Sequence, residues 1–175
     1  QYSYDFDKFL FMPSMLTAGV EFSHNKLNDK MLGYNREINQ EVNVYSVYLQ
    51  NEWKTARFSF LLGGRLDKNS HVDDPIFSPR LNIRYNPITD LSFRASYSEG
   101  FRAPQTYDED LHVAAVGGKV TLIQVAEDLK TEKSRSYSAS VDYYTTLGAV
   151  QINLLVEGFY TRLKNPFVLE EVDTG

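Results

Sequence analysis

The residue types that most often carry out catalysis are sparse in this sequence and do not form a catalytic pattern. The chain has no cysteine, which removes disulfides, thiolate metal sites and cysteine nucleophiles together. Serine is plentiful, but His24, His71 and His112 fall in stretches predicted to be loops, without a nucleophile elbow or a paired acid. The sequence therefore does not predict an enzyme.

Adjacent carboxylates after residue 107 are the strongest candidate for a metal site. Asp108, Glu109 and Asp110 are consecutive, with His112 close behind. Carboxylates that are adjacent in an extended chain point to opposite sides, and no spaced ligand set of the calcium-loop type follows. We expect a solvated loop here, and we predict no metal and no cofactor.

Alternation of apolar and polar residues predicts a long β-hairpin over residues 77–104. The apolar positions are Leu81, Ile83 and Tyr85, then Leu91, Phe93, Ala95 and Tyr97; the polar positions are Arg80, Asn82 and Arg84, then Ser92, Arg94, Ser96 and Ser98. Successive strand side chains point to opposite faces, so each strand has one apolar and one polar face. Pro87, between Asn86 and Asp90, places the turn where the alternation breaks. These strands are about ten residues long, nearer the transmembrane length of about 9–11 than the globular mode of about 5–6.

The rest of the chain continues this pattern. Further strands are predicted over 16–23, 42–53, 57–67, 133–144 and 150–163, with partial strands at 1–7 and 167–175, so that the chain begins and ends inside strands. Short turns near 8–14, 54–56, 86–90 and 145–148 alternate with longer polar loops near 24–41, 68–76 and 104–131. Short connections at one rim and long ones at the other are typical of outer-membrane barrels. The predicted fold is all-β, an up-and-down antiparallel meander of about seven strands plus two partial ones.

Composition narrows the possible partners. The net charge is -5, with lysine and arginine dispersed among 175 residues, and the residues are 14% aromatic with twelve tyrosines. No basic patch suited to phosphate backbones is present, so we expect no nucleic-acid partner. No run approaches the roughly 18–20 apolar residues of a spanning helix.

Three segments resemble the barrel region of TonB-dependent outer-membrane receptors, the active transporters for siderophores, cobalamin and related nutrients. They are SPRLNIRYNP, LSFRASYSEGFRAP and LKTEKSRSYSASVDYY, all within residues 78–144. The chain departs from the family pattern at Glu127-Asp128, where Asn-Pro is frequent, and at Thr131, where Pro is frequent. The resemblance implies a barrel of about 22 strands filled by an N-terminal plug domain. It also implies a TonB box that couples transport to the inner membrane.

On this basis residues 1–175 are interpreted as a partial transmembrane β-barrel, an arc of a larger barrel without the plug domain. An arc must pair its edges, because an unsatisfied backbone group in hydrocarbon costs several kcal/mol. The expected location is the bacterial outer membrane. The expected partners are outer-membrane lipid, the TonB system through the missing plug, and a metal-chelate or cobalamin-like nutrient.

The resemblance also gives roles to three groups of residues. Candidates for the wet lumen face are Glu52, Arg65, Asp67, Arg80, Arg84, Arg94 and Asp142. Their arginines either pair with plug acids or guide anionic chelates, or they form ordinary ion pairs with the acids of the same face. Candidates for ligand contact in an extracellular loop are Phe101, Arg102, Tyr107 and Asp108. Candidates for an aromatic girdle at the membrane interface are Trp53, Tyr85, Tyr97, Tyr143 and Tyr160.

Two other interpretations remain open from the sequence. A soluble antiparallel β-sandwich acting as a binding or adhesion module would place the same apolar residues against a second sheet. An outer-membrane barrel enzyme would use loop or wall residues. The position of the apolar face, on the convex outside or in a sealed core, separates the transporter from the sandwich.

Overall fold

The structure is a computed structural model that describes residues 1–34, 36–107, 114–116, 119–121, 125–126, 128–168 and 170. Ten strands and one 3-10 turn account for the regular structure of these residues. They are β1 (Tyr2–Phe9), β2 (Met12–Met31), η1 (Leu32–Tyr34), β3 (Arg36–Lys54), β4 (Phe58–Asn69), β5 (Ile76–Ile88), β6 (Leu91–Arg102), β7 (Ala114–Val116), β8 (Lys119–Thr121), β9 (Glu132–Leu147) and β10 (Val150–Lys164). No helix in the described ranges is long and apolar enough to cross a membrane.

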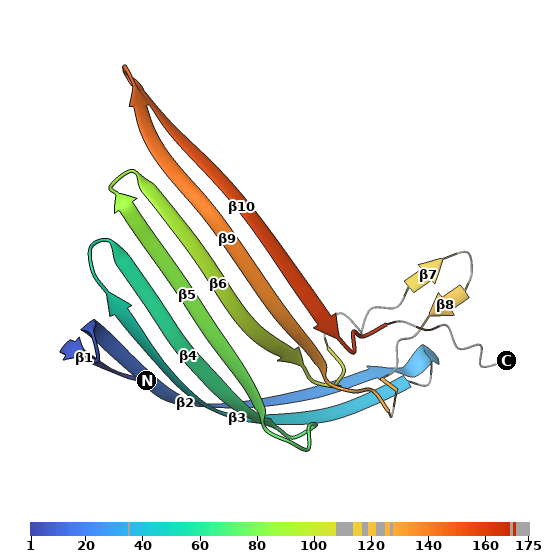
Figure 1. The fold of residues 1–175 in the computed structure, drawn as a ribbon. Helices are drawn as coiled ribbons and strands as arrows, with labels where there is room; N and C mark the ends of the chain where they lie inside the picture. The colour runs from blue at the N-terminus through green and yellow to red at the C-terminus, as the bar shows by residue number, and fades with distance from the viewer. Residues whose placement is uncertain are drawn as a thin grey trace.

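Eight of these strands form one antiparallel sheet in the order β1-β2-β3-β4-β5-β6-β9-β10, while β7 and β8 pair separately (Figure 1). Neighbours in the sheet are neighbours in the sequence except where the β7–β8 hairpin intervenes, so the topology is a meander. The sheet does not close, since β1 and β10 are its two edges. This confirms the predicted all-β meander and the predicted open arc.

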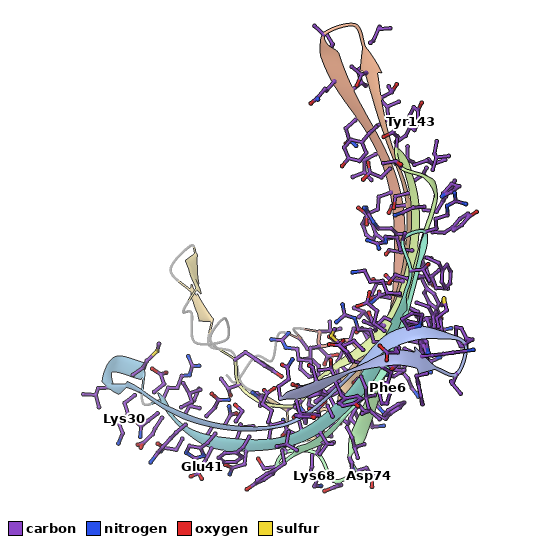
Figure 2. The ribbon with its side chains drawn as sticks, turned by 90° about the vertical axis from the view of Figure 1, so that its left-hand side faces the viewer. Phe6, Lys30, Glu41, Lys68, Asp74 and Tyr143 are labelled. Carbon is purple, nitrogen blue, oxygen red and sulfur yellow. The ribbon has the colours of Figure 1, made fainter. Side chains whose placement is uncertain are left out.

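The sheet is curved into a trough, and its two faces differ in chemistry. Figure 2 shows the trough edge-on, with the β7–β8 hairpin over the hollow side and Glu41, Lys68 and Tyr143 on the convex side. The strand register extends this assignment to the whole sheet, because residues directly opposite each other share a face. In this register Leu81 is opposite Tyr97 and Leu62, on the convex side.

The molecule has almost no hydrophobic core. In the part of the chain that is described, the buried apolar residues are Val42, Trp53, Ile76 and Ala103. Large apolar side chains on the convex face are open to the outside, with exposed fractions of 76% for Val20 and 72% for Val156. No second sheet of the described residues covers this face, as a sandwich would require.

One predicted loop was wrong. Residues 24–41 were expected to form a long polar loop, but β2 and β3 continue as a paired hairpin up to Met31 and Arg36, with η1 at its tip. His24, expected in a loop, is therefore a strand residue. The prediction was wrong because the convex face changes from apolar to polar beyond Phe22 and Tyr45, which breaks the alternation on which it depended.

In this extension the convex side is polar and the concave side carries the apolar residues. The convex positions are His24, Lys26, Asn28 and Lys30 opposite Asn43, Glu41, Asn39 and Glu37; the concave positions include Leu27, Met31, Ile38 and Val42. Such an exchange is expected where a strand leaves hydrocarbon for water on its outer side.

Two prolines expected in turns lie inside strands. Pro13 is in β2 and Pro87 is in β5, each beside a register irregularity that interrupts the pairing. Bulges accommodate a residue that cannot donate to the ladder. The β9–β10 turn lies at residues 148–149, where Gly148 has a φ of 64°. Residues 108–113, 117–118, 122–124 and 127 of the predicted loop 104–131 lie outside the described residues, and the described part contains the short strands β7 and β8. The described residues 167, 168 and 170 of the last predicted strand are not in a strand.

Candidate functional site

The concave face of the trough is the candidate site, because the predicted lumen residues of five strands, β3, β4, β5, β6 and β9, lie on it. The register puts all seven predicted lumen residues on this face: Glu52, Arg65, Asp67, Arg80, Arg84, Arg94 and Asp142. Strand periodicity alone explains this, since each residue has the parity of the polar positions of its strand. Whether they line an aqueous lumen stays a prediction.

Arg65 is the centre of the best-connected group on this face. Its Nε donates to Asp67 Oδ1 at 2.7 Å, its Nη1 to Glu21 Oε2 at 3.0 Å, and its Nη2 to Ser46 Oγ at 2.7 Å. Ser46 Oγ in turn donates to Asp67 Oδ1 at 2.5 Å. Asp67 is buried, with an exposed fraction of 3%, whereas Glu21 is open to solvent. The group is a cross-strand network over β2, β3 and β4 around one buried carboxylate.

A second buried carboxylate lies across the sheet on β9. Asp142 accepts a hydrogen bond from Asn153 Nδ2 at 2.5 Å, and its Oδ2 is 3.6 Å from Arg94 Nη1. Arg94 is half exposed, so this longer contact is weak beside the one at Arg65. Glu52 accepts from Ser59 Oγ at 2.7 Å instead of pairing with an arginine.

Arg80 and Arg84 differ from Arg65 and Arg94. Across the described part of the chain, no carboxylate is within ion-pair distance of either guanidinium. Arg84 is directly opposite Arg94 in the register, and its Nε is buried without a hydrogen-bond partner among the described residues. The concave face of β5 and β6 therefore has an excess of positive charge. Like charges that lie directly opposite each other, as Arg84 and Arg94 do, destabilise a sheet.

Only part of the predicted loop site comes together. The guanidinium of Arg102, at the end of β6, lies 4.1 Å from the ring centroid of Tyr107 and 5.1 Å from that of Phe167. Phe101 lies in β6 and not in a loop, opposite Lys133 on the convex side, so it points away from this cluster. Asp108 lies outside the described residues.

Residues that sequence reasoning missed hold the start of the loop after β6. Gln40, on the concave side of the β2–β3 extension, donates through Nε2 to Thr106 O at 2.9 Å and accepts from Thr106 N at 2.7 Å through Oε1. Tyr107 Oη donates to Ala103 O at 3.0 Å. Gln40 was missed because its strand was assigned to a loop, and the alternation of Leu27 and Ile38 on that face was the available signal.

The predicted girdle residues all lie on the convex face. Trp53, Tyr85 and Tyr143 are near the short-turn end, and Tyr97 and Tyr160 are near the long-connection end. Trp53 is buried among rings, stacked on Phe9 and Phe11 with centroids 6.2 and 5.4 Å away, and its Nε1 donates to Phe9 O at 2.9 Å. The rings of Tyr97, Tyr137 and Tyr160 form a ladder across three strands with centroid separations of 5.0 and 6.3 Å.

Between these rings the convex face is apolar in every strand of the hairpins. From Tyr45 to Trp53 is nine residues, as is from Phe77 to Tyr85, and nine residues match the roughly 9–11 that a tilted strand needs to cross a bilayer. The polar exceptions among the described residues are Asn51 and Ser14, which are buried beside each other, and Ser14 Oγ donates to Asn51 Oδ1 at 3.3 Å. The arrangement has the shape of a lipid-facing band with aromatic borders.

Comparison with known proteins agrees with this geometry. The family described as TonB dependent receptor-like, beta-barrel, matches residues 1–175. A search of curated protein sequences gave no match. Among solved structures, the siderophore receptor PirA from Pseudomonas aeruginosa superposes with a TM-score of 0.77 at 18% identity, covering 99% of this chain and 33% of that one.

Two further structures show the same fold. PirA from Acinetobacter baumannii has a TM-score of 0.59 at 17% identity, covering 92% of this chain and 33% of that one. A mutant of the ferric enterobactin receptor PfeA from Pseudomonas aeruginosa has a TM-score of 0.62 at 18% identity, covering 92% of this chain and 25% of that one. The chain thus spans about a third or less of each of these structures.

Proposed function

The chain belongs to the TonB-dependent receptor-like β-barrel family of the bacterial outer membrane, and from this premise we propose that it forms wall and extracellular connections of an active nutrient receptor. The single observation that carries the proposal is that the sheet exposes its apolar residues on the outside and has its charged residues on the inside of the curve. Its apolar side is convex and exposed, and its charged side is concave. Such a sheet is unstable in water alone and suits a wall between lipid and an aqueous interior.

In this proposal the convex band faces the lipid hydrocarbon. Its aromatic borders are the girdle, with Trp53, Tyr85 and Tyr143 at the periplasmic border and Tyr97 and Tyr160 at the extracellular one. Beyond the extracellular border the convex residues become charged on several strands, as from Tyr45 to Glu41 and from Tyr137 to Arg135. Short connections then lie in the periplasm and the β2–β3 extension lies outside the cell.

Because the chain has no cysteine, this orientation is directly testable by labelling. In full-length receptor within outer membranes, Val47→Cys on the convex face should resist a charged thiol reagent. Gln50→Cys, on the concave face three residues farther along β3, is the matched control and should react once the membrane is permeabilised. Labelling of Val47→Cys in intact membranes at the rate found for the urea-unfolded receptor would contradict a lipid-facing position.

The concave face is proposed to face the lumen and the plug domain of the complete receptor. Arg65 is already satisfied by Asp67 and Glu21, so we propose that it has a structural role. Arg80 and Arg84 are the better candidates for pairing with plug carboxylates or for guiding an anionic chelate, because no carboxylate of the described chain neutralises them. Charge reversal at Arg84 with unchanged uptake would remove Arg84 from this role.

For the substrate we propose a ferric siderophore. The support is that the similar structures are those of siderophore or ferric enterobactin receptors. Arg102, whose guanidinium lies over the Tyr107 ring, is our candidate for contact with an anionic ligand at the outer mouth. No residue of the chain is proposed to catalyse a reaction, and coupling to TonB would act through the plug.

Growth of a strain lacking the gene tests the substrate. We expect the deletion to abolish growth on one ferric siderophore as sole iron source, and complementation with the full-length gene to restore it. Growth on cobalamin as the limiting nutrient is the matched condition. A defect confined to cobalamin would overturn the siderophore assignment and keep the transporter, whereas normal growth on every iron and cobalamin source would count against nutrient uptake.

A further inference from the structure

A cluster of cations that the proposed function does not use lies on the convex face of β9 and β10, at the end remote from the turn at residues 148–149. Lys133 and Arg135 on β9 are directly opposite Lys164 and Arg162 on β10. All four residues are exposed and lie on the convex side, because they share the register of Tyr137 and Tyr160. We call them the basic rim cluster. It begins one outward-facing position beyond the tyrosine ladder.

Little of this charge is neutralised within the described chain. Arg135 Nε lies 2.9 Å from Glu99 Oε1, and no other carboxylate of the described residues is within ion-pair distance of the cluster. Lys133 and Lys164 face each other, as do Arg135 and Arg162. Two consecutive like-charge pairs across a ladder destabilise the sheet unless an anion lies between or above them.

The β2–β3 hairpin has the opposite arrangement at the same rim. There Lys30 Nζ lies 2.8 Å from Glu37 Oε1, and Lys26 is directly opposite Glu41. That hairpin therefore neutralises its own convex charges strand against strand, whereas the β9–β10 hairpin repeats one sign. The contrast indicates a local need for an external anion and not a general property of the rim.

We propose that the basic rim cluster binds phosphate groups of anionic lipid head groups in the outer leaflet, an inference that rests on the proposed membrane orientation. Tyrosine rings lie at the level of head groups in membrane barrels, so cations one position farther out meet lipid phosphates and not acyl chains. Basic residues at a membrane surface attract anionic lipid, and two facing pairs suit a lipid with two phosphates. The long side chains reach along the surface while their stems stay on apolar neighbours.

Native mass spectrometry of the full-length receptor with added bisphosphorylated lipid A tests this proposal. The variant combines Lys133→Gln, Arg162→Gln and Lys164→Gln, and the control combines Lys26→Gln and Lys30→Gln on the self-neutralised hairpin. Each cation near an anionic surface contributes about fivefold to the affinity, so we expect lipid A binding about 100-fold weaker in the triple variant. The control variant and binding of phosphatidylcholine should not change.

Three results would overturn the assignment. Unchanged lipid A binding by the triple variant would show that the charges are solvated or are neutralised by an acid from elsewhere in the receptor. An equal loss in the control variant would show a non-specific charge effect. Displacement of lipid A by inorganic phosphate at the same concentration would show an ion site and not a lipid site.

Failure of the membrane proposal itself would be visible separately. Every variant is first checked for a heat-modifiable shift on gel electrophoresis and for fractionation with the outer membrane. If the wild-type receptor fails both checks, the membrane orientation is refuted. If the triple variant passes both checks and binds lipid A as the wild type does, only the lipid site is refuted.

Discussion

Removing the Arg65 guanidinium should destabilise the barrel by leaving a buried carboxylate without its cation. Asp67 has an exposed fraction of 3% and would keep only the Ser46 hydroxyl as a donor. A hydrogen bond to a charged partner contributes about 1.5–3 kcal/mol, while the pair with exposed Glu21 contributes at most about 1 kcal/mol. Because Arg65 is itself 36% exposed and water can enter, we expect Arg65→Ala to cost about 2–3 kcal/mol.

A double-mutant cycle measures this coupling in the full-length receptor. Urea unfolding in detergent would be followed for Arg65→Ala, Asp67→Asn and the double variant. Arg57→Ala is the control, because this exposed arginine lies in the β3–β4 turn and no carboxylate of the described chain pairs with it. We expect the double variant to recover about 1 kcal/mol or more relative to additivity. Strictly additive losses, or a loss at Arg57→Ala as large as at Arg65→Ala, would refute the reasoning.

Two further predictions concern a strand contact and a titration. Gly63→Val should cost about 1–3 kcal/mol, because a Cβ there would lie 2.6 Å from Gln50 Cβ, whereas Gly64→Val should cost less since the nearest atoms belong to the end of an exposed, rotatable ring; equal losses in urea unfolding would contradict this. In the β2–β3 extension, a hydrogen bond from Lys30 lowers the pKa of Glu37. The stability that this pair contributes is then present above the ordinary pKa of the carboxyl and is lost as pH falls through the lowered value. A carbon-13 NMR titration should show the Glu37 pKa rising in Lys30→Gln, and an unchanged pKa would contradict the assignment.

The alternation of apolar and polar residues predicted most of the sheet, because the two faces of each strand have different surroundings and successive side chains point to opposite faces. Where each face keeps the same polarity along the strand, as over Leu81–Tyr85 and Leu91–Tyr97, the alternation alone identifies the strand and the face on which each residue lies. The prediction failed over residues 24–41 because polar residues on the convex side were interpreted as the end of the strand, whereas β2 and β3 stay paired up to Met31 and Arg36. Leu27 and Ile38, on the parity opposite to Phe22 and Tyr45, were the signal for continuation.

The candidate site was predictable by face but not by contact. The alternation in the sequence is enough to place Arg65, Asp67, Arg80 and Arg84 on the polar face of their strands. Their different contacts depend on which residues of the neighbouring strands lie opposite them. For Arg65 this depends on the registers of two strand pairs, β2–β3 and β3–β4. Glu21 is 44 residues from Arg65 in the sequence, so no local pattern could have identified it as a partner.

The exchange of polarity beyond Phe22 and Tyr45 constrains how such an extension changes in length. Insertion of one residue into β2 below this point would turn every later side chain to the other face, bringing Lys26 inward and Leu27 outward, unless a bulge absorbed it. Paired additions of two residues per strand keep the phase. The β2–β3 extension can therefore grow or shrink in even steps without changing which residues of β2 and β3 lie on the convex face on the near side of Phe22 and Tyr45.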